Sequence, residues 1–176
     1  MQVAQGARPD LAALVTAVFS ASEGAAEGAV VGGLVRDLLA TTPAADIRVF
    51  CATEAGETLG GVIFTRLDFP EDPHRVLLLS PMAVATAMQG QGVGLALLRH
   101  ALAALRAEGW DVALTYGDPA FYGRSGFARI TEAQARAPLP LSMPQGWLGR
   151  SLDAGAMPVL RGQSRCVAAL DRAELW

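Results

Sequence analysis

A glycine-rich segment between a strongly apolar run and an amphipathic run limits most strongly how this chain can fold. Val76 to Leu79 are four consecutive apolar residues within the run Arg75–Val84, which predicts a strand buried on both faces. From Gly94 to Glu108, leucines and alanines recur every three or four residues, the pattern of an amphipathic helix that stops at Gly109. Between strand and helix lies Gln89-Gly90-Gln91-Gly92-Val93-Gly94. This strand–loop–helix unit predicts a domain in which helices pack on a sheet.

The rest of the chain predicts elements that flank this unit. Two helical patterns come first, over about residues 10–20 and through Val31 to Leu38, with an interruption at Ser22–Gly28 and Asp10 as the N-cap of the first helix. The further predicted elements are a hairpin of Asp46–Ala52 and Thr58–Leu67 that turns near Gly56, a strand at Asp111–Tyr116, a short helix begun by Asp118-Pro119, a surface connector at Pro138–Pro144 and a final strand at Arg165–Leu170. We therefore expect residues 1–176 to form one α/β or α+β three-layer domain.

The composition excludes several functions. All 14 basic residues are Arg and Lys is absent, which rules out a Walker-type phosphate loop and Schiff-base or pyridoxal-phosphate chemistry, because each requires a Lys amine. A net charge of −3 argues against nucleic-acid binding, which usually needs a basic patch. No apolar run of about eighteen residues predicts a membrane span, and the first residues lack the pattern of a signal peptide. We expect a cytoplasmic protein in which Cys51 and Cys166 are reduced, buried and not metal ligands.

The glycine-rich loop is a candidate anion site. Glycines let a backbone approach a ligand closely, and the start of a helix presents unpaired N–H groups and the positive end of the helix dipole. The loop is therefore suited to a pyrophosphate, although a glycine-rich turn without a ligand has the same sequence. A dinucleotide-binding loop is excluded, because Leu95 occupies the position of its third glycine and Asp111 begins the next strand, where the acidic residue should end it.

A second motif lies downstream, in the run Gly117-Asp118-Pro119-Ala120-Phe121-Tyr122-Gly123-Arg124-Ser125-Gly126-Phe127. Together with Gln89, Gly92 and Gly94, which fit the pattern Gln/Arg-x-x-Gly-x-Gly/Ala, it makes the chain resemble the GNAT superfamily of acyl-CoA-dependent N-acetyltransferases and, within it, the YhbS-like branch. The resemblance is strongest over residues 46–131. It implies a mixed, mostly antiparallel sheet that is splayed between its fourth and fifth strands and has helices on both faces.

By this resemblance, acetyl-CoA is the co-substrate, lies in the splay and needs no metal. Its pantetheine bonds like an added strand to the backbone of Met82, Ala83 and Val84, because strands that part leave ladder groups without partners. Pro81, which has no N–H, helps to end the pairing there. The pyrophosphate is held by the N–H groups of Gln89, Gly90, Gln91, Gly92, Val93 and Gly94.

The resemblance also implies the chemistry, a direct attack of an amine on the thioester. Tyr122 stands five residues before Phe127, where the family commonly has the general acid for the departing thiolate; the alternative is an aromatic packing residue. Asp118 is expected mainly to cap its helix.

No general base is evident from the sequence. His74, His100, Glu23 and Glu27 are each more simply explained as solvated side chains, and ordered water can take the proton of the amine. The absence of an obvious base therefore does not argue against an enzyme.

Two functions remain open. The first is an N-acetyltransferase that moves acetyl from acetyl-CoA to a primary amine of a small molecule or peptide. The alternative is a non-catalytic acyl-CoA-binding or sensing domain, which would not need Tyr122. The amine itself is not predicted, because this scaffold serves many acceptors. We expect no nucleic-acid or membrane partner, and a homodimer is compatible with the superfamily.

Overall fold

The computed structural model describes residues 1–153 and 155–176. The described chain divides into two compact units. The first unit comprises Met1–Phe64 and Pro81–Ala101, and the second comprises Thr65–Ser80 and Leu102–Trp176. Each unit is described by itself below.

The sheet of the first unit contains three neighbouring strands, β1, β2 and β3. β1 (Gln2–Gln5) pairs antiparallel with β2 (Ile47–Glu54), and β3 (Glu57–Arg66) lies on the other side of β2. Ala55 and Gly56 connect β2 to β3 with φ angles of 50° and 88°, the left-handed conformation that two-residue hairpin turns require. The predicted hairpin is therefore confirmed, whereas β1 was not predicted.

Helices α1 (Leu11–Glu23) and α2 (Ala25–Thr41) are separated by Gly24 alone. The predicted interruption at Ser22–Gly28 is thus wrong in extent, because Gly24, at φ 100°, breaks the helix by itself. A β-carbon on Gly28 would lie 2.0 Å from Ser20 Oγ, and one on Gly32 would lie 1.8 Å from Thr16 Oγ1. The glycines of α2 therefore allow the two helices to pack backbone against backbone.

The predicted cap of α1 is also corrected. Asp10 occupies the N-cap position but makes no capping hydrogen bond. Its carboxylate instead accepts a hydrogen bond from the Thr58 hydroxyl at 2.8 Å. Asp10 therefore ties the start of α1 to β3, a use that sequence spacing does not reveal.

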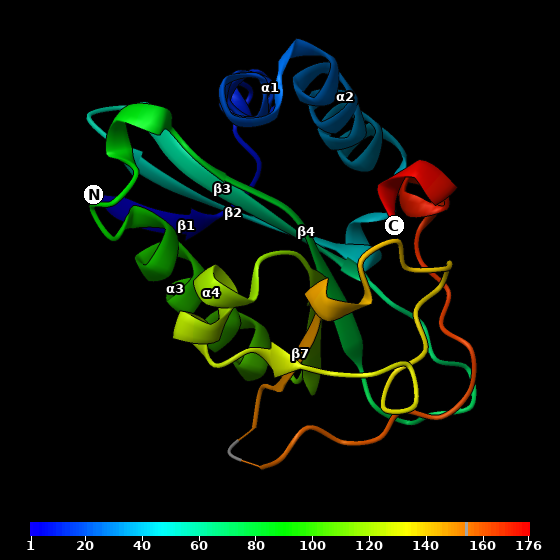
Figure 1. The fold of residues 1–176 in the computed structure, drawn as a ribbon. Coiled ribbons are helices and arrows are strands. Elements are labelled where there is room, and N and C mark those ends of the chain that lie inside the picture. Colours follow the sequence, from blue (N-terminus) through cyan, green and yellow to red (C-terminus); the bar gives the residue numbers. More distant parts are fainter. Residues whose placement is uncertain (154) are drawn as a thin grey trace. The chain divides into compact units, whose positions relative to one another are not determined.

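Helices cover both faces of the β1–β3 strands in the first unit (Figure 1). On one face, Leu11 of α1 lies so close to Gly61 that a β-carbon on this glycine would be 2.3 Å from Leu11 Cδ1. On the other face, the Phe50 ring lies edge-on to Phe64 and to His100 of α3 (Val93–Ala107), each with ring centroids 6.2 Å apart. Gly61 and Phe64 point to opposite faces because side chains alternate along a strand.

The second unit contains the parallel strand pair. β4 (Val76–Val84) pairs with β5 (Val112–Tyr116) in parallel through Val76 to Leu79, and β7 (Trp147–Ser151) pairs antiparallel with β5. The two-residue β6 (Ala128–Arg129) adds to β7. Strand order is therefore β1-β2-β3-β4 in the first unit and β4-β5-β7-β6 in the second, which confirms the predicted mixed, mostly antiparallel sheet.

The C-terminal segment departs from prediction. Arg165–Leu170 was predicted as a strand, but Arg165 forms only an isolated bridge to Asp68 and Ala168–Leu170 is a 3₁₀ turn. The Leu170 carbonyl accepts a hydrogen bond from Trp176 Nε1 at 2.9 Å, so this apolar segment folds around a tryptophan instead of extending along the sheet. Cys166 in this segment is only half-buried, contrary to prediction, whereas Cys51 is buried; both are free thiols.

Two negative findings concern the described residues. No helix among them is both long and apolar enough to cross a membrane. They also contain no group of three or more His, Cys, Asp and Glu side chains that could hold a metal ion.

Candidate functional site

The pairing between β3 and β4 shifts by one residue toward the end of β4. This shift decides which backbone N–H and C=O groups of β4 point away from β3. The Leu67 N–H donates to the Val76 carbonyl at 3.0 Å, and the Ala85 N–H donates to the Leu59 carbonyl at 2.8 Å. An uninterrupted antiparallel ladder that starts from the first bond would pair Leu59 with Val84. Since Leu59 is paired with Ala85 instead, β4 contains one extra residue, a β-bulge.

The bulge turns the backbone of Met82 and Val84 away from β3. In an antiparallel ladder, alternate residues point their N–H and C=O groups to the same side. Ala83 therefore faces β3 together with Ala85, and its carbonyl lies 2.9 Å from where a β-carbon on Gly60 would be. Of the three residues predicted to bind pantetheine, Met82 and Val84 present ladder groups away from β3 and Ala83 lies between them.

The loop after β4 is held by its own glutamines. It begins with a 3₁₀ turn at Thr86–Met88. The Gln89 Nε2 atom donates to the Val84 carbonyl at 3.1 Å, and the Gln91 Nε2 atom donates to the Ala87 carbonyl at 2.9 Å. Both glutamine side chains therefore shape the loop, and the Gln89 N–H, predicted to bind pyrophosphate, donates within the loop to the Thr86 carbonyl at 3.3 Å.

Gly90 and Gly92 have left-handed backbones, with φ angles of 74° and 82°. A β-carbon on either glycine would have no described atom within 4 Å. The two glycines are thus required by backbone conformation and not by crowding. The space beside them is open to a ligand that approaches the backbone.

Helix α3 begins directly after this loop. Its first turn is closed by the Ala96 N–H, which donates to the Gly92 carbonyl at 3.0 Å. The N–H groups of Val93, Gly94 and Leu95 precede that bond and point out of the helix end. Val93 is buried, which anchors the helix start. The loop and helix end together can bind a phosphate group without any Lys side chain.

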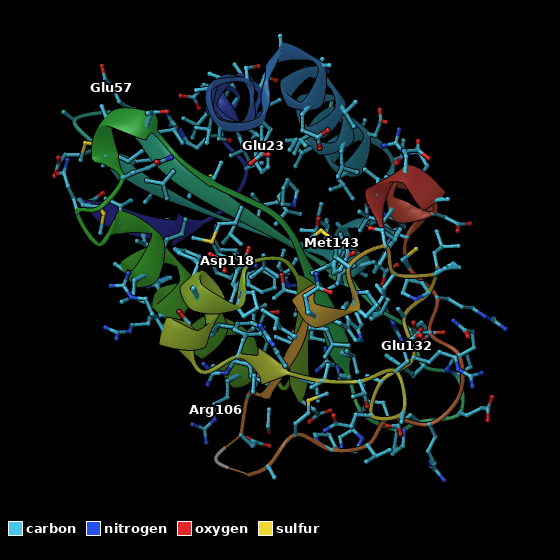
Figure 2. The ribbon with its side chains drawn as sticks, viewed as in Figure 1. Glu23, Glu57, Arg106, Asp118, Glu132 and Met143 are labelled. Carbon is cyan, nitrogen blue, oxygen red and sulfur yellow. The ribbon has the colours of Figure 1, made fainter. Side chains whose placement is uncertain are left out.

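Tyr122 belongs to the second unit, at the end of the short helix α4 (Pro119–Tyr122). Asp118 caps this helix, as predicted, by accepting a hydrogen bond from the Ala120 N–H at 2.8 Å, and Figure 2 shows Asp118 at the start of the helix. The Tyr122 ring lies edge-on to Phe121 and Phe127, with ring centroids 5.1 Å and 5.7 Å apart. These contacts hold the ring in place.

The surroundings of the Tyr122 hydroxyl keep it protonated. Burial raises its pKa, the Thr115 hydroxyl lowers it through a hydrogen bond and the Asp118 carboxylate raises it, with a net rise to about 12. Thr115 is fully buried, and its hydroxyl donates to the Leu79 carbonyl at 3.1 Å. Tyr122 is therefore a neutral phenol at physiological pH, able to donate a hydrogen bond and poorly able to act as a base.

Thr115, Gly117 and Arg150 are contacts of the Tyr122 region that sequence reasoning missed. Gly117 gives room to the Tyr122 ring. The Arg150 guanidinium donates to the Ser125 carbonyl, in the turn that follows Tyr122. Burial lowers the pKa of Arg150. The sequence did contain a signal for Thr115, because it is a polar residue directly after the apolar run Val112–Leu114. No local signal marks Arg150.

The other titratable candidates have structural or solvated surroundings. His74 Nδ1 lies 2.6 Å from an Asp72 carboxylate oxygen, and His100 is exposed on α3 apart from its ring contact with Phe50. Glu23, at the end of α1 (Figure 2), and Glu27 are exposed. Nothing in these contacts singles out a general base.

The tryptophans are packing residues. Trp147 is fully buried, and its Nε1 atom donates to the Ala135 carbonyl at 2.8 Å. Trp176 stacks on Tyr116 at 6.2 Å and meets Trp147 edge-on at 6.1 Å. Trp110 is buried against the Arg75 guanidinium, 4.3 Å from its ring centroid.

Comparison with known proteins agrees with this geometry. Residues 45–129 match the family model described as an acetyltransferase (GNAT) domain. The uncharacterized N-acetyltransferase YjhQ of Escherichia coli (strain K12) is 32% identical over 138 residues, which cover 76% of each chain. The uncharacterized N-acetyltransferase YhbS of the same strain is 30% identical over 87 residues, 49% of this chain and 52% of that protein.

Two solved structures share the fold. The GNAT family N-acetyltransferase YhbS from Escherichia coli, in complex with CoA, superposes with a TM-score of 0.75 over 97% of this chain and 92% of that chain, at 23% identity. A GNAT family acetyltransferase from Brucella melitensis, in complex with acetyl-CoA, gives a TM-score of 0.69 over 97% of this chain and 99% of that chain, at 25% identity.

Proposed function

The chain belongs to the GNAT family of acetyltransferases, and from that premise we propose that it transfers the acetyl group of acetyl-CoA to a primary amine of a small molecule or peptide. It is an acyltransferase, and residues 1–176 act as one N-acetyltransferase domain. The observation that carries the proposal is the loop from Gln89 to Gly94, whose two left-handed glycines lead directly from the bulged strand β4 into the start of α3.

The backbone of the first unit binds the co-substrate. Met82 and Val84 offer backbone groups that face away from β3, so the pantetheine amides bond to them as an added strand would, with Ala83 held on β3 between them. The Val84 carbonyl already accepts from Gln89. This leaves the backbone groups of Met82 and the N–H of Val84 as the pantetheine partners.

The pyrophosphate is bound by N–H groups from Gly90 through Gly94; the Gln89 N–H, which the sequence also predicted as a donor, is already donated to the Thr86 carbonyl at 3.3 Å. The loop from Thr86 to Gly94 contains no acidic residue, so nothing in it repels the phosphates. Left-handed glycines and the positive end of α3 attract an anion without Lys or metal. Such a site fits CoA better than it fits a neutral ligand.

Tyr122 assists the departure of sulfur when the amine attacks the thioester. A phenol with a pKa of about 12 is more than three pKa units weaker as an acid than a thiol with a pKa near 8.5, so complete proton transfer alone is uphill. A hydrogen bond donated to the sulfur as its charge develops is favourable along the whole path. We therefore assign Tyr122 as the general acid, acting first through that hydrogen bond.

Thermal unfolding with acetyl-CoA tests the binding half of the proposal. At a hundred times its dissociation constant, a ligand of the folded state adds about 2.7 kcal/mol to the free energy of unfolding. We expect a clear rise in Tm with acetyl-CoA and a smaller one with ADP, which has the pyrophosphate and lacks pantetheine. An unchanged Tm at millimolar acetyl-CoA would overturn both the enzyme and the acyl-CoA-binding alternative.

Thiol release from acetyl-CoA, measured against a panel of primary amines, tests the catalytic half. Tyr122→Phe should lower kcat by about 10²-fold, at the low end of general-acid effects, with KM for acetyl-CoA nearly unchanged. The matched control is Tyr116→Phe, which removes the other tyrosine hydroxyl, bonded to Ser142 and Met143. Binding of acetyl-CoA with no amine acetylated would instead support the non-catalytic acyl-CoA-binding domain.

We also propose that the protein works in the cytoplasm, where acetyl-CoA is available, and needs no nucleic-acid or membrane partner. Sedimentation of the purified chain with and without acetyl-CoA tests the homodimer that the family admits.

A further inference from the structure

Arg150 is a half-buried cation that bonds to backbone carbonyls instead of a carboxylate. Over residues 1–153 and 155–176, its guanidinium donates to the carbonyls of Ser125 and Ser151 and to no Asp or Glu side chain. Burial lowers the pKa of Arg150, because removal from water disfavours the charged form. A buried charge is costly unless hydrogen bonds compensate it. The carbonyl contacts are therefore what makes Arg150 tolerable here.

The bond to Ser125 lies at the end of a helical run. Helix α4 continues directly into a 3₁₀ turn at Gly123–Ser125, and the last carbonyls of a helix have no partner within it. The Gly123 carbonyl accepts from the Gly126 N–H at 3.0 Å. The Ser125 carbonyl accepts from the Arg150 guanidinium. Arg150 thus caps the run from a neighbouring strand, as a cation at the C-terminal end of a helix can.

A second contact places the guanidinium against the next residue. A β-carbon on Gly126 would lie 3.2 Å from Arg150 Nη1 and 3.5 Å from its Cζ. Gly126 also has a left-handed φ of 82°, so glycine serves both the backbone conformation and the close approach of Arg150. The guanidinium is therefore packed against two consecutive residues of the chain.

The sheet of the second unit anchors the other end of the Arg150 side chain. Arg150 pairs with Ala113 of β5, and its neighbour Gly149 pairs with Ala128 of β6. The backbone of β7 is thus held on both sides at this point. From it, the Arg150 side chain reaches a turn that lies outside the ladder, which fixes the turn relative to these strands.

The chain from Tyr122 to Phe127 forms a closed loop around that turn. The Phe127 N–H donates to the Tyr122 carbonyl at 3.4 Å, and the two rings meet edge-on with centroids 5.7 Å apart. The two residues that Arg150 contacts, Ser125 and Gly126, lie within this loop. A shift of the loop therefore moves Phe127 against the Tyr122 ring and displaces the phenol.

We propose that Arg150 is a positioning residue for the acetyl transfer: its guanidinium fixes the turn that follows α4, and this turn sets the orientation of the Tyr122 ring. The inference rests on the acid role proposed for Tyr122. It adds a cation that acts through the phenol and not on the reacting atoms. Since the acceptor is a backbone carbonyl, the donor side chain is the part that a substitution can remove.

Arg150→Met removes the charge and the hydrogen-bond donors and keeps an unbranched side chain. With the best amine from the panel, it should lower kcat by about tenfold, less than the roughly 10²-fold that a misplacement of about 1 Å can cost. The KM for acetyl-CoA should stay within about twofold. Arg150→Lys should recover most of the loss, since one donor suffices for one carbonyl, and Arg150→Ala, as a second variant, should lose as much as Arg150→Met. An unchanged kcat in Arg150→Met and Arg150→Ala would overturn the inference.

Arg75→Met is the matched control. Arg75 Nη1 donates to the Glu108 and Gly109 carbonyls at 2.8 Å and 3.0 Å, so it makes the same kind of contact after α3 instead of after α4. Its loss should lower the free energy of unfolding and leave kcat unchanged. A fall in kcat as large as that of Arg150→Met would show that loss of stability alone explains both, and would refute the role of Arg150.

A double-mutant cycle separates positioning from a general structural effect. If Arg150 acts through the Tyr122 hydroxyl, Arg150→Met should have almost no further effect on kcat in the Tyr122→Phe background. Equal losses in both backgrounds would show that Arg150 acts by another route, contrary to the proposal.

The two tyrosines of this chain allow the ring itself to be observed. Protein labelled with ¹³C at the tyrosine Cζ should give two signals, which Tyr116→Phe and Tyr122→Phe assign. Arg150→Met should shift the Tyr122 signal and leave the Tyr116 signal in place, and Arg150→Lys should bring the Tyr122 signal back. A Tyr122 signal that stays in place in Arg150→Met would contradict the positioning role.

The two proposals fail in different ways. If Tyr122→Phe leaves turnover intact, the acid role of Tyr122 is wrong, and the role of Arg150 in the reaction is wrong with it. If Tyr122→Phe lowers turnover and Arg150→Met does not, only the inference about Arg150 is wrong.

Discussion

The Tyr122 ring lies against the backbone of Gly117: a β-carbon on this glycine would be 2.8 Å from Tyr122 Cε2. Real β-carbons do not approach other atoms so closely. Position 117 therefore requires glycine because the Tyr122 side chain, five residues later, packs against it. Asp118 caps α4 between them. Gly117 and Asp118 thus set the position of the ring from the chain that precedes it.

Gly117→Ala should move the Tyr122 ring and lower kcat by about tenfold. The unfolding free energy should fall by about 1–3 kcal/mol, the usual range for overpacking. Gly123→Ala is the matched control, because Gly123 has a helical φ of −56° and a β-carbon there would have no described atom within 4 Å. Steady-state kinetics and thermal melts of both variants check this. Equal kinetics for the two would show that the Gly117 contact does not position Tyr122.

Gly92→Ala and Gly90→Ala should each weaken acetyl-CoA binding by tenfold or more. An alanine at these left-handed φ angles costs about 1–2 kcal/mol. We expect the loop to relieve this strain by changing its backbone conformation, which turns its N–H groups away from the ligand. Gly56→Ala, in the β2–β3 turn, is the control, since Gly56 has a φ of 88° and equally open space. Calorimetric titration with acetyl-CoA should separate the variants. A loss of affinity in Gly56→Ala as large as in Gly92→Ala would contradict the assignment of the loop.

Asp118→Asn should lower the pKa of Tyr122 from its value of about 12. Burial is the largest cause of the raised pKa and stays in place, but the repulsion between Asp118 and the phenolate is removed. Because asparagine also caps helices well, α4 should remain intact, whereas Asp118→Ala should lose about 1 kcal/mol of stability. Alkaline titration of Cζ-labelled tyrosine measures the shift. A Tyr122 midpoint that stays in place would show that Asp118 has no electrostatic effect on it.

The same shift predicts how alkali affects stability. An unfolded tyrosine ionises near pH 10, and Tyr122 in the fold ionises near 12. Its contribution to stability is therefore complete below pH 10 and is lost as the pH rises toward 12. In Tyr122→Phe, the free energy of unfolding should therefore depend less on pH between 10 and 12 than it does in the wild type. Urea titrations at several pH values measure this difference.

Asp72 should stabilise the second unit at neutral pH and not in acid. Burial alone would raise the pKa of this carboxyl, but hydrogen bonds from the His74 and Arg161 N–H groups and from the His74 ring lower it overall. The stabilisation is therefore present above about pH 4 and is lost as the pH falls below the ordinary carboxyl range. Asp72→Asn should cost about 1–3 kcal/mol at pH 7.

The exposed Asp68 provides the control for Asp72. It pairs with Arg66 at 3.4 Å on the surface, so Asp68→Asn should cost less than about 1 kcal/mol. Urea unfolding at pH 7 and pH 3 checks both variants. A cost for Asp72→Asn that is the same at both pH values would contradict the ionised, hydrogen-bonded carboxylate.

The sequence predicted those parts of the fold whose signal is local. The apolar run before the glycines, the leucine period of α3 and the Asp118-Pro119 cap each depend on neighbouring residues, and each is confirmed. The strands β1 and β7 were missed because each depends on its partner strand. Gln2–Gln5 has little apolar character of its own, and β7 pairs with β5 across the 30 residues 117–146.

The candidate site shows the same division. Motif spacing identified Tyr122 and the loop glycines, because both belong to short continuous runs. Thr115 and Arg150 could not be assigned by spacing, since their contacts with Tyr122 and Ser125 arise only when β5 and β7 are placed. The bulge in β4 is likewise invisible until two hydrogen bonds fix the register.

That bulge makes this part of the protein sensitive to length and tolerant of chemistry. Met82 and Val84 contribute peptide groups, and every residue except proline carries the same ones. A variant chain can therefore exchange these two side chains and still present an identical edge. Deleting one residue between Val76 and Met82 would turn toward β3 the backbone N–H and C=O groups that now point away from it, and expose those that now face β3. Substitutions in this part of β4 are therefore tolerated, whereas a change in its number of residues is not.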